Sequence, residues 1–73
     1  MNIPKIKVKY SGLVGEMAKY GHKNSDLGKL LGLDHSAISR RLSGQIEWSI
    51  GEIEKICDFY QKDYYQLFTD KGE

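Results

Sequence analysis

The sequence contains only one cysteine and one proline. A single cysteine excludes an intrachain disulfide, so the fold has to be stable without covalent cross-links. Cys57 falls within an apolar pattern of helical period, and we expect it to pack as a small hydrophobic side chain rather than act as a reactive thiol. The proline is Pro4, so no proline interrupts a helix in the rest of the chain.

The chain also lacks any apolar stretch of membrane-spanning length. Its first residues, from Met1 to Lys5, contain no continuous apolar core of the kind found in a secretory signal peptide. We therefore expect a cytoplasmic protein without a membrane partner.

Catalytic and metal-binding patterns are missing as well. No nucleophile is paired with a base, and no glycine-rich phosphate-binding loop occurs. The two histidines and the cysteine stand at spacings that do not suit a metal site. We expect no enzymatic activity, no cofactor and no bound metal.

The chain does have the composition of one small folded domain. Its 73 residues are 40% hydrophobic and 29% charged, which is enough for a single modest core across residues 1–73. The net charge is only +1, but residues 1–45 are net basic and the remainder is net acidic. One end could therefore face a polyanion while the other repels it, although many proteins carry such a mixed surface without that role.

The N-terminal segment, residues 1–10, is a candidate basic arm. From Lys5 to Tyr10, lysines alternate with apolar or aromatic residues, and this period of two predicts a short extended strand or arm. The row of Lys5, Lys7 and Lys9 either follows a phosphate backbone or forms the solvated face of that strand.

The apolar periods that follow predict two helices. Ser11 is placed to cap a first helix over about residues 12–20. Asn24 or Ser25 is placed to cap a shorter second helix. Gly32 follows that helix, where a left-handed residue would end it and turn the chain sharply.

A third helix is predicted directly after this turn. Asp34 is placed to cap it, and it runs over about residues 35–43. Gly28 has no side chain at the point where two helices are expected to cross closely. Only about three residues join the second and third helices, a connection typical of a helix-turn-helix, which we predict over residues 24–44.

Two capping boxes predict the last helices. Ser49 and Glu52 have the spacing for one box, and Asp63 and Gln66 have it for the other. Trp48, just before the first box, is interpreted as a lid on the core. The C-terminal turn and tail, residues 63–73, would set aromatic and apolar side chains against the core: Tyr64 or Tyr65, Leu67 and Phe68. The expected fold is all-α, with about five helices and a short N-terminal extended arm or strand.

The exposed face of the third helix is the candidate functional site. It presents polar side chains that can reach base edges and phosphates in a major groove: His35, Ser36, Ser39 and Arg40. Lys23 and Asn24, before and at the start of the second helix, are placed to contact phosphate. Arg41 is interpreted as lying along the surface with its stem on apolar neighbours. His35 is explained equally well as a solvent-exposed helix start.

Residues 24–44 resemble the helix-turn-helix of the lambda-repressor-like family, also called the Cro/repressor or XRE-type family. In that family a Leu-small-x-x-x-Gly-Leu stretch precedes a polar recognition helix that ends near a glycine. The resemblance covers about residues 11–60. The family more often has alanine at the position of Gly28, glutamine at that of Asn24 and a bulky apolar residue at that of Arg41.

A closer resemblance extends to very short phage-encoded regulators. It is carried by Tyr10-Ser11-Gly12-Leu13, Leu42-Ser43-Gly44, Trp48-Ser49 with Glu52-Ile53, and Tyr64-Tyr65-Gln66-Leu67-Phe68. That group includes Cro-like proteins and, in some lactococcal phages, a modulator of repression that binds and inactivates the phage repressor. The resemblance implies a role in the lysis or lysogeny decision.

Two functions therefore stand side by side. The first is a transcription regulator that binds double-stranded operator DNA, as a weak homodimer because one small module makes few contacts. The alternative is an antirepressor that binds the phage repressor through protein contacts. The low net charge favours the antirepressor, whereas the polar third helix with its adjacent arginines favours the DNA binder.

Overall fold

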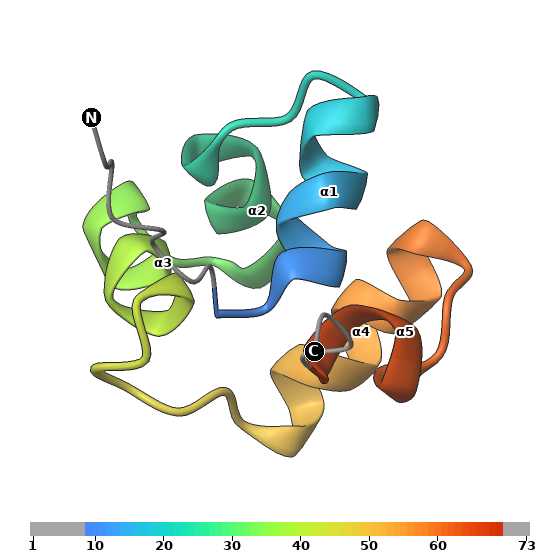
Figure 1. Ribbon diagram of the computed structural model, residues 1–73. Helices are drawn as coiled ribbons and strands as arrows, with labels where there is room; N and C mark the ends of the chain where they lie inside the picture. Colours follow the sequence, from blue (N-terminus) through green and yellow to red (C-terminus); the bar gives the residue numbers. More distant parts are fainter. Residues whose placement is uncertain (1–8, 70–73) are drawn as a thin grey trace, which may run out of the picture.

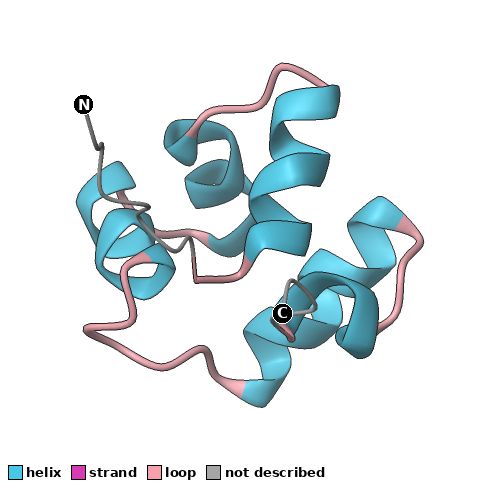
Figure 2. Cartoon of the chain, viewed as in Figure 1, coloured by secondary structure: helices cyan, strands magenta, loops and turns pink. Residues whose placement is uncertain are grey.

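The computed structural model describes residues 9–69. These residues form five helices and contain no strand, which confirms the all-α fold class (Figure 1, Figure 2). The helices are α1 (Ser11–Lys19), α2 (Asn24–Leu31), α3 (His35–Leu42), α4 (Ile50–Tyr60) and α5 (Tyr64–Phe68). Among these residues, no helix is long and apolar enough to cross a membrane.

The core receives one fully buried side chain from every helix. These side chains are Leu13, Leu27, Ile38, Ile56 and Leu67. Burying each one stabilises the folded chain by about 1.5–3 kcal/mol. Helices of 5 to 11 residues are too short to be stable in isolation, so each helix depends on this shared interior.

The helices pack in two groups that are connected by α2 and α4. α2 packs chiefly on α3 and also on α4, while α5 packs on both α1 and α4. In Figure 1, α3 lies at one edge of the molecule, and α4 and α5 lie together on the other side of α1 and α2. α3 therefore has only part of its circumference inside the protein.

Three aromatic rings from distant parts of the chain seal one end of the core. Tyr10, Trp48 and Phe68 contact each other edge to face, with ring centroids 5.6 to 6.3 Å apart, an arrangement that aromatic pairs favour. Trp48 is only 8% exposed, which confirms its role as a lid. The three rings join the start of α1, the α3–α4 loop and α5.

Both described residues of the expected N-terminal strand adopt another conformation. Residues 1–8, with Lys5 and Lys7, lie outside the described residues. Lys9 and Tyr10 form a turn, and Tyr10 has a left-handed backbone with a φ of 63°. The strand prediction is wrong at these two positions, because the turn places the Tyr10 ring against Trp48 and Phe68 instead of continuing the extended chain.

Three of the predicted helix caps are present. The Asp34 carboxylate accepts from the Ala37 N–H at 2.8 Å. Ser49 and Glu52 form a reciprocal capping box, and so do Asp63 and Gln66. These caps satisfy backbone N–H groups that have no partner within their own helices.

The caps predicted for the first two helices are wrong. α1 begins at Ser11 itself, and its N-cap, Tyr10, makes no side-chain hydrogen bond. The N-cap of α2 is Lys23, whose backbone N–H donates to the Asp26 carboxylate at 2.7 Å. The Lys23 carbonyl accepts the first helical N–H, from Leu27, so Asn24 and Ser25 lie inside the first turn and not at the cap position.

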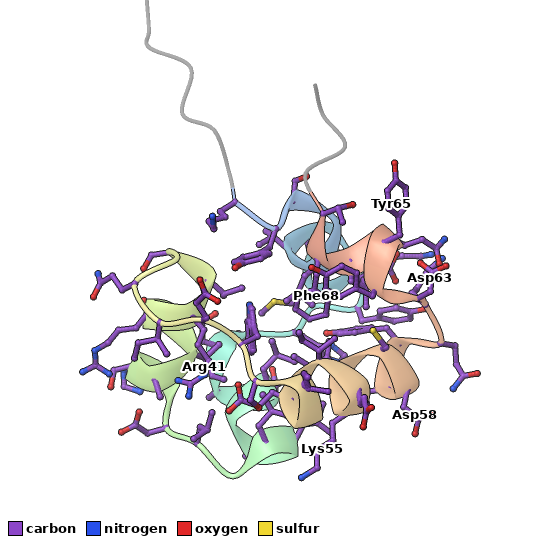
Figure 3. The ribbon with its side chains drawn as sticks, turned by 90° about the horizontal axis from the view of Figure 1, so that it is seen from below. Arg41, Lys55, Asp58, Asp63, Tyr65 and Phe68 are labelled. Atoms are coloured by element: carbon purple, nitrogen blue, oxygen red, sulfur yellow. The ribbon has the colours of Figure 1, made fainter. Side chains whose placement is uncertain are left out.

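The C-terminal helix buries two of its residues as predicted. Leu67 and Phe68 are in the core. Tyr64 stacks on Phe68 with the ring centroids 5.8 Å apart, but 53% of it is exposed. Tyr65 points away from the body of the protein (Figure 3).

Gly12 allows α1 to approach α5 at backbone distance. A Cβ atom at Gly12 would overlap the Gln66 carbonyl oxygen, whereas a Cβ atom at Gly15 would meet nothing. The chain therefore has no room for a side chain where these two helices touch.

We expect Gly12→Ala to lower the free energy of unfolding by at least about 2 kcal/mol, because the added methyl group has to push two backbones apart. Gly15→Ala in the same helix is the matched control. It should raise stability by about 0.5–1 kcal/mol through helix propensity. Urea unfolding followed by circular dichroism measures both changes, and equal effects of the two substitutions would contradict this account.

Candidate nucleic-acid interface

The turn between α2 and α3 sets the direction of the third helix. Gly32 ends α2 with a left-handed φ of 73°. The Leu33 N–H then donates to the Gly28 carbonyl at 2.9 Å, which closes the helix end in the usual left-handed manner. α3 begins three residues after Gly32, with Asp34 as its cap.

Gly28 is essential to this turn for a reason that differs from the prediction. The Leu33 carbonyl oxygen folds back onto α2, and a Cβ atom at Gly28 would overlap it. The close approach is therefore between a helix and the turn, and not between two crossing helices. An alanine here, the residue common in the lambda-repressor-like family, would have to displace the turn.

α3 has a buried face and an outward face. Ile38 is fully buried, and Leu42 packs against the core. His35, Ser39 and Arg40 are exposed. The structure thus brings three of the predicted site residues together on one exposed part of α3.

Ser36, the fourth predicted residue on this helix, takes part in the cap. Its hydroxyl donates to Asp34 Oδ1 at 3.0 Å, and its side chain is half-buried. The hydrogen bond from the Ala37 backbone N–H, followed by that from Ser36, lowers the pKa of the Asp34 carboxyl. Ser36 therefore helps to fix the start of α3.

Lys23 and Asn24 come from a different helix. Lys23 is the exposed N-cap of α2, and Asn24 is the half-buried first residue of that helix. They stand where the free backbone N–H groups of α2 begin, a favourable position for an anion such as phosphate.

Arg41 connects α3 to α4, an interaction that the sequence did not indicate. Its Nε donates to Glu52 Oε1 at 3.1 Å, and its Nη1 donates to the Ala37 carbonyl at 3.1 Å. The side chains of Arg41 and Glu52 are only 15% and 19% exposed. In Figure 3 Arg41 lies between α3 and α4. The guanidinium group is therefore held by specific partners and does not simply lie along the surface.

Glu52 serves two helices with one oxygen. Its Oε1 accepts from the Ser49 N–H in the α4 capping box and from Arg41. Burial is the largest influence on this carboxyl and raises its pKa, but the hydrogen bonds from Ser49 and Arg41 outweigh burial and leave the pKa below the ordinary value. The capping box in the sequence was the only signal for this residue, and it did not indicate the second partner.

The remaining candidates for metal binding are the histidine, cysteine and acidic side chains. Within residues 9–69, no three histidine, cysteine or acidic side chains gather closely enough to hold a metal ion. Cys57 packs against the core, and burial, followed by the nearby Asp63 carboxylate, raises the pKa of its thiol. This agrees with the prediction that Cys57 packs as a small hydrophobic side chain.

Comparison with known proteins identifies one family. Residues 16–73 match the model of the BetR domain, which is most of the chain and includes the complete helix-turn-helix. No curated protein and no solved structure matches the chain.

Replacing Glu52 by glutamine tests the link between α3 and α4. Glutamine still accepts the Ser49 N–H but loses the charge that attracts Arg41, so we expect a loss of about 1 kcal/mol at pH 7. Because the folded-state pKa is lowered, this stabilisation is present above the unfolded value of about 4.5 and disappears as the pH falls through the folded value.

Thermal unfolding of the wild type and of Glu52→Gln between pH 7 and pH 3 measures this loss of stability. The difference in stability between wild type and Glu52→Gln should be largest at pH 7 and shrink in acid. Glu54→Gln, an exposed position on the same helix, is the control and should leave the pH profile unchanged. A difference that persists unchanged at pH 3 would rule out an ionic contribution.

Proposed function

Because the chain belongs to the BetR domain family, whose match supports a regulatory role, we propose that it binds double-stranded operator DNA sequence-specifically through α3. The main support is the geometry of α3, in which Ile38 and Arg41 fix the inner face while His35, Ser39 and Arg40 are exposed. A rigid helix with polar side chains on its outer face suits the major groove.

The exposed residues have distinct roles in this proposal. Arg40 donates two N–H groups to the edge of a guanine, and Ser39 contacts a base or a phosphate. His35 and Ser36 are at the end of α3 that would enter the groove. At the start of α2, Lys23 and Asn24 contact the phosphate backbone. These contacts set the register on the duplex without reading its sequence.

The finer biological role is also a proposal. We propose a Cro-like regulator of a phage lysis/lysogeny switch, acting in the bacterial cytoplasm without catalytic activity. The resemblance of residues 10–13, 42–44 and 64–68 to short phage regulators supports this role. A domain of this size makes few DNA contacts, so it would act as a weak homodimer on paired half-sites.

A second function is supported by the acidic side of α4. Glu54, Asp58 and Asp63 line an open depression of about 390 Å³ together with Lys62. Figure 3 shows Asp58 pointing away from the body of the protein. Such a surface complements a basic DNA-binding domain. This supports an antirepressor that binds the phage repressor and prevents it from binding its operator.

Selection from a randomised duplex library, followed by fluorescence anisotropy at two salt concentrations, tests the proposed DNA binding. We expect enrichment of one motif and weaker binding at high salt. Arg40→Ala should cost about 1–3 kcal/mol on that motif. Lys55→Ala, an exposed lysine on α4, is the matched control and should leave the affinity unchanged.

These binding measurements, followed by a repressor-release assay, distinguish the two functions. Equal affinity for the enriched motif and for a shuffled duplex would contradict sequence-specific DNA binding. If the protein then released the phage repressor from its operator, the antirepressor would be supported. In that case Asp58→Asn should weaken the release, whereas Arg40→Ala should not affect it.

A further inference from the structure

Four rings gather where the α1–α2 turn meets the end of α4. Tyr20 and His22 come from the turn, and Phe59 and Tyr60 come from α4. The ring centroid of His22 lies 5.5 to 5.8 Å from the centroids of the other three rings. Together with Gln61 these residues line a cavity of about 400 Å³. We call it the aromatic pocket.

The floor of the aromatic pocket is fixed, whereas its rim is open. Tyr60 is 6% exposed, and its hydroxyl forms a 2.7 Å hydrogen bond with His22 Nδ1. The His22 backbone N–H donates to the Met17 carbonyl at 2.7 Å. In contrast, Tyr20 is 57% and Phe59 is 50% exposed. Two exposed aromatic side chains, Tyr20 and Phe59, thus lie beside the hydrogen-bonded pair of Tyr60 and His22. Exposed aromatic side chains held in this way are suited to contact a partner.

Two carboxylates act on the floor of the pocket, and one of them is paired with a lysine. Burial, followed by the Glu16 and Asp26 carboxylates, raises the pKa of Tyr60 to about 12. Glu16 Oε1 is buried and makes no hydrogen bond, and Glu16 Oε2 lies 4.0 Å from Lys62 Nζ. Carboxylates close to Tyr60 favour a cation over an anion beside these aromatic ring faces.

A cation already lies on one of these rings within the chain. Lys19 Nζ stands over the Tyr20 ring, 5.6 Å from its centroid. This contact places a positive group at cation–π distance from a ring of the cluster. Phe59 has no such cation among the described contacts and leaves half of its surface to solvent.

We propose that the aromatic pocket binds an arginine side chain presented by a partner protein. A planar guanidinium stacks on the exposed Phe59 ring, while its N–H groups face Tyr60 and the carboxylates that act on it. Arginine and tyrosine are both enriched at the energetic centres of protein interfaces. The C-terminal ends of α1 and α4 lie on the opposite side of the molecule from α3 in Figure 1. This site therefore goes beyond the proposed DNA contact and leaves α3 accessible.

Titration with three short model peptides tests the proposed arginine site. The peptides are acetyl-Gly-Ala-Xaa-Ala-Gly-amide with arginine, leucine or glutamate at Xaa, and the readout is the aromatic ¹H–¹³C NMR signals of the full chain. The arginine peptide should shift the Tyr20 and Phe59 signals with a dissociation constant on the order of 10 mM. It should bind about fivefold more tightly than the leucine peptide, and the glutamate peptide should not bind.

Substitutions that keep the apolar volume but remove the ring faces separate cation binding from general hydrophobic contact. Tyr20→Leu and Phe59→Leu should each abolish the preference for arginine over leucine. Tyr64→Leu, an aromatic residue of similar exposure on α5, is the control and should retain it. Glu16→Gln should weaken arginine binding by removing negative charge from the floor.

The outcomes separate this proposal from DNA binding. Equal shifts with arginine and leucine peptides, or no shift at these rings with any peptide, would overturn the arginine site. Phe59→Leu should keep the affinity for the selected DNA motif, and Arg40→Ala should keep the peptide response. Failure of one site in these experiments therefore leaves the other site standing.

Discussion

Each of the five described helices contributes one fully buried side chain to a single interior, and the placement of the proposed binding surfaces depends on that arrangement. Ile38 enters the core from α3 and meets Leu27 and the other buried residues there. Because none of the helices is long enough to be stable alone, α3 has a defined direction only while its inner side is engaged. The hydrogen bond between Arg41 and Glu52 adds a polar connection in the last turn of the same helix.

The features that could be predicted from sequence are those encoded by residues close together in the chain. Apolar periods located the helices, and a side chain three residues from a backbone amide located the caps at Asp34, Ser49 and Asp63. The exposed residues of α3 follow from the same period, since Ile38 defines the inner side. Gly32 was predictable because few residues other than glycine adopt its backbone conformation.

The features that could not be predicted depend on which distant segments meet. Gly12 looks like an ordinary helix-start glycine until Gln66 is placed against it. Arg41 could not be assigned a partner, because Glu52 already had a complete explanation as part of a capping box. The aromatic pocket forms only when the α1–α2 turn meets the end of α4, and neither segment has a pattern that indicates the other. Local competition misled as well, since Asp26 accepts from the Lys23 N–H and the N-cap of α2 is Lys23 instead of Asn24 or Ser25.

The two sides of α3 have separate roles: one side connects the helix to the protein, and the other carries the proposed DNA contacts. Ile38 and Arg41 belong to the connecting side, because they join the helix to the rest of the protein. The side chains of His35, Ser39 and Arg40 are exposed on the other side. Under the proposed DNA binding, a related chain could therefore exchange these three side chains as a set and acquire a new recognition preference while its interior stays the same.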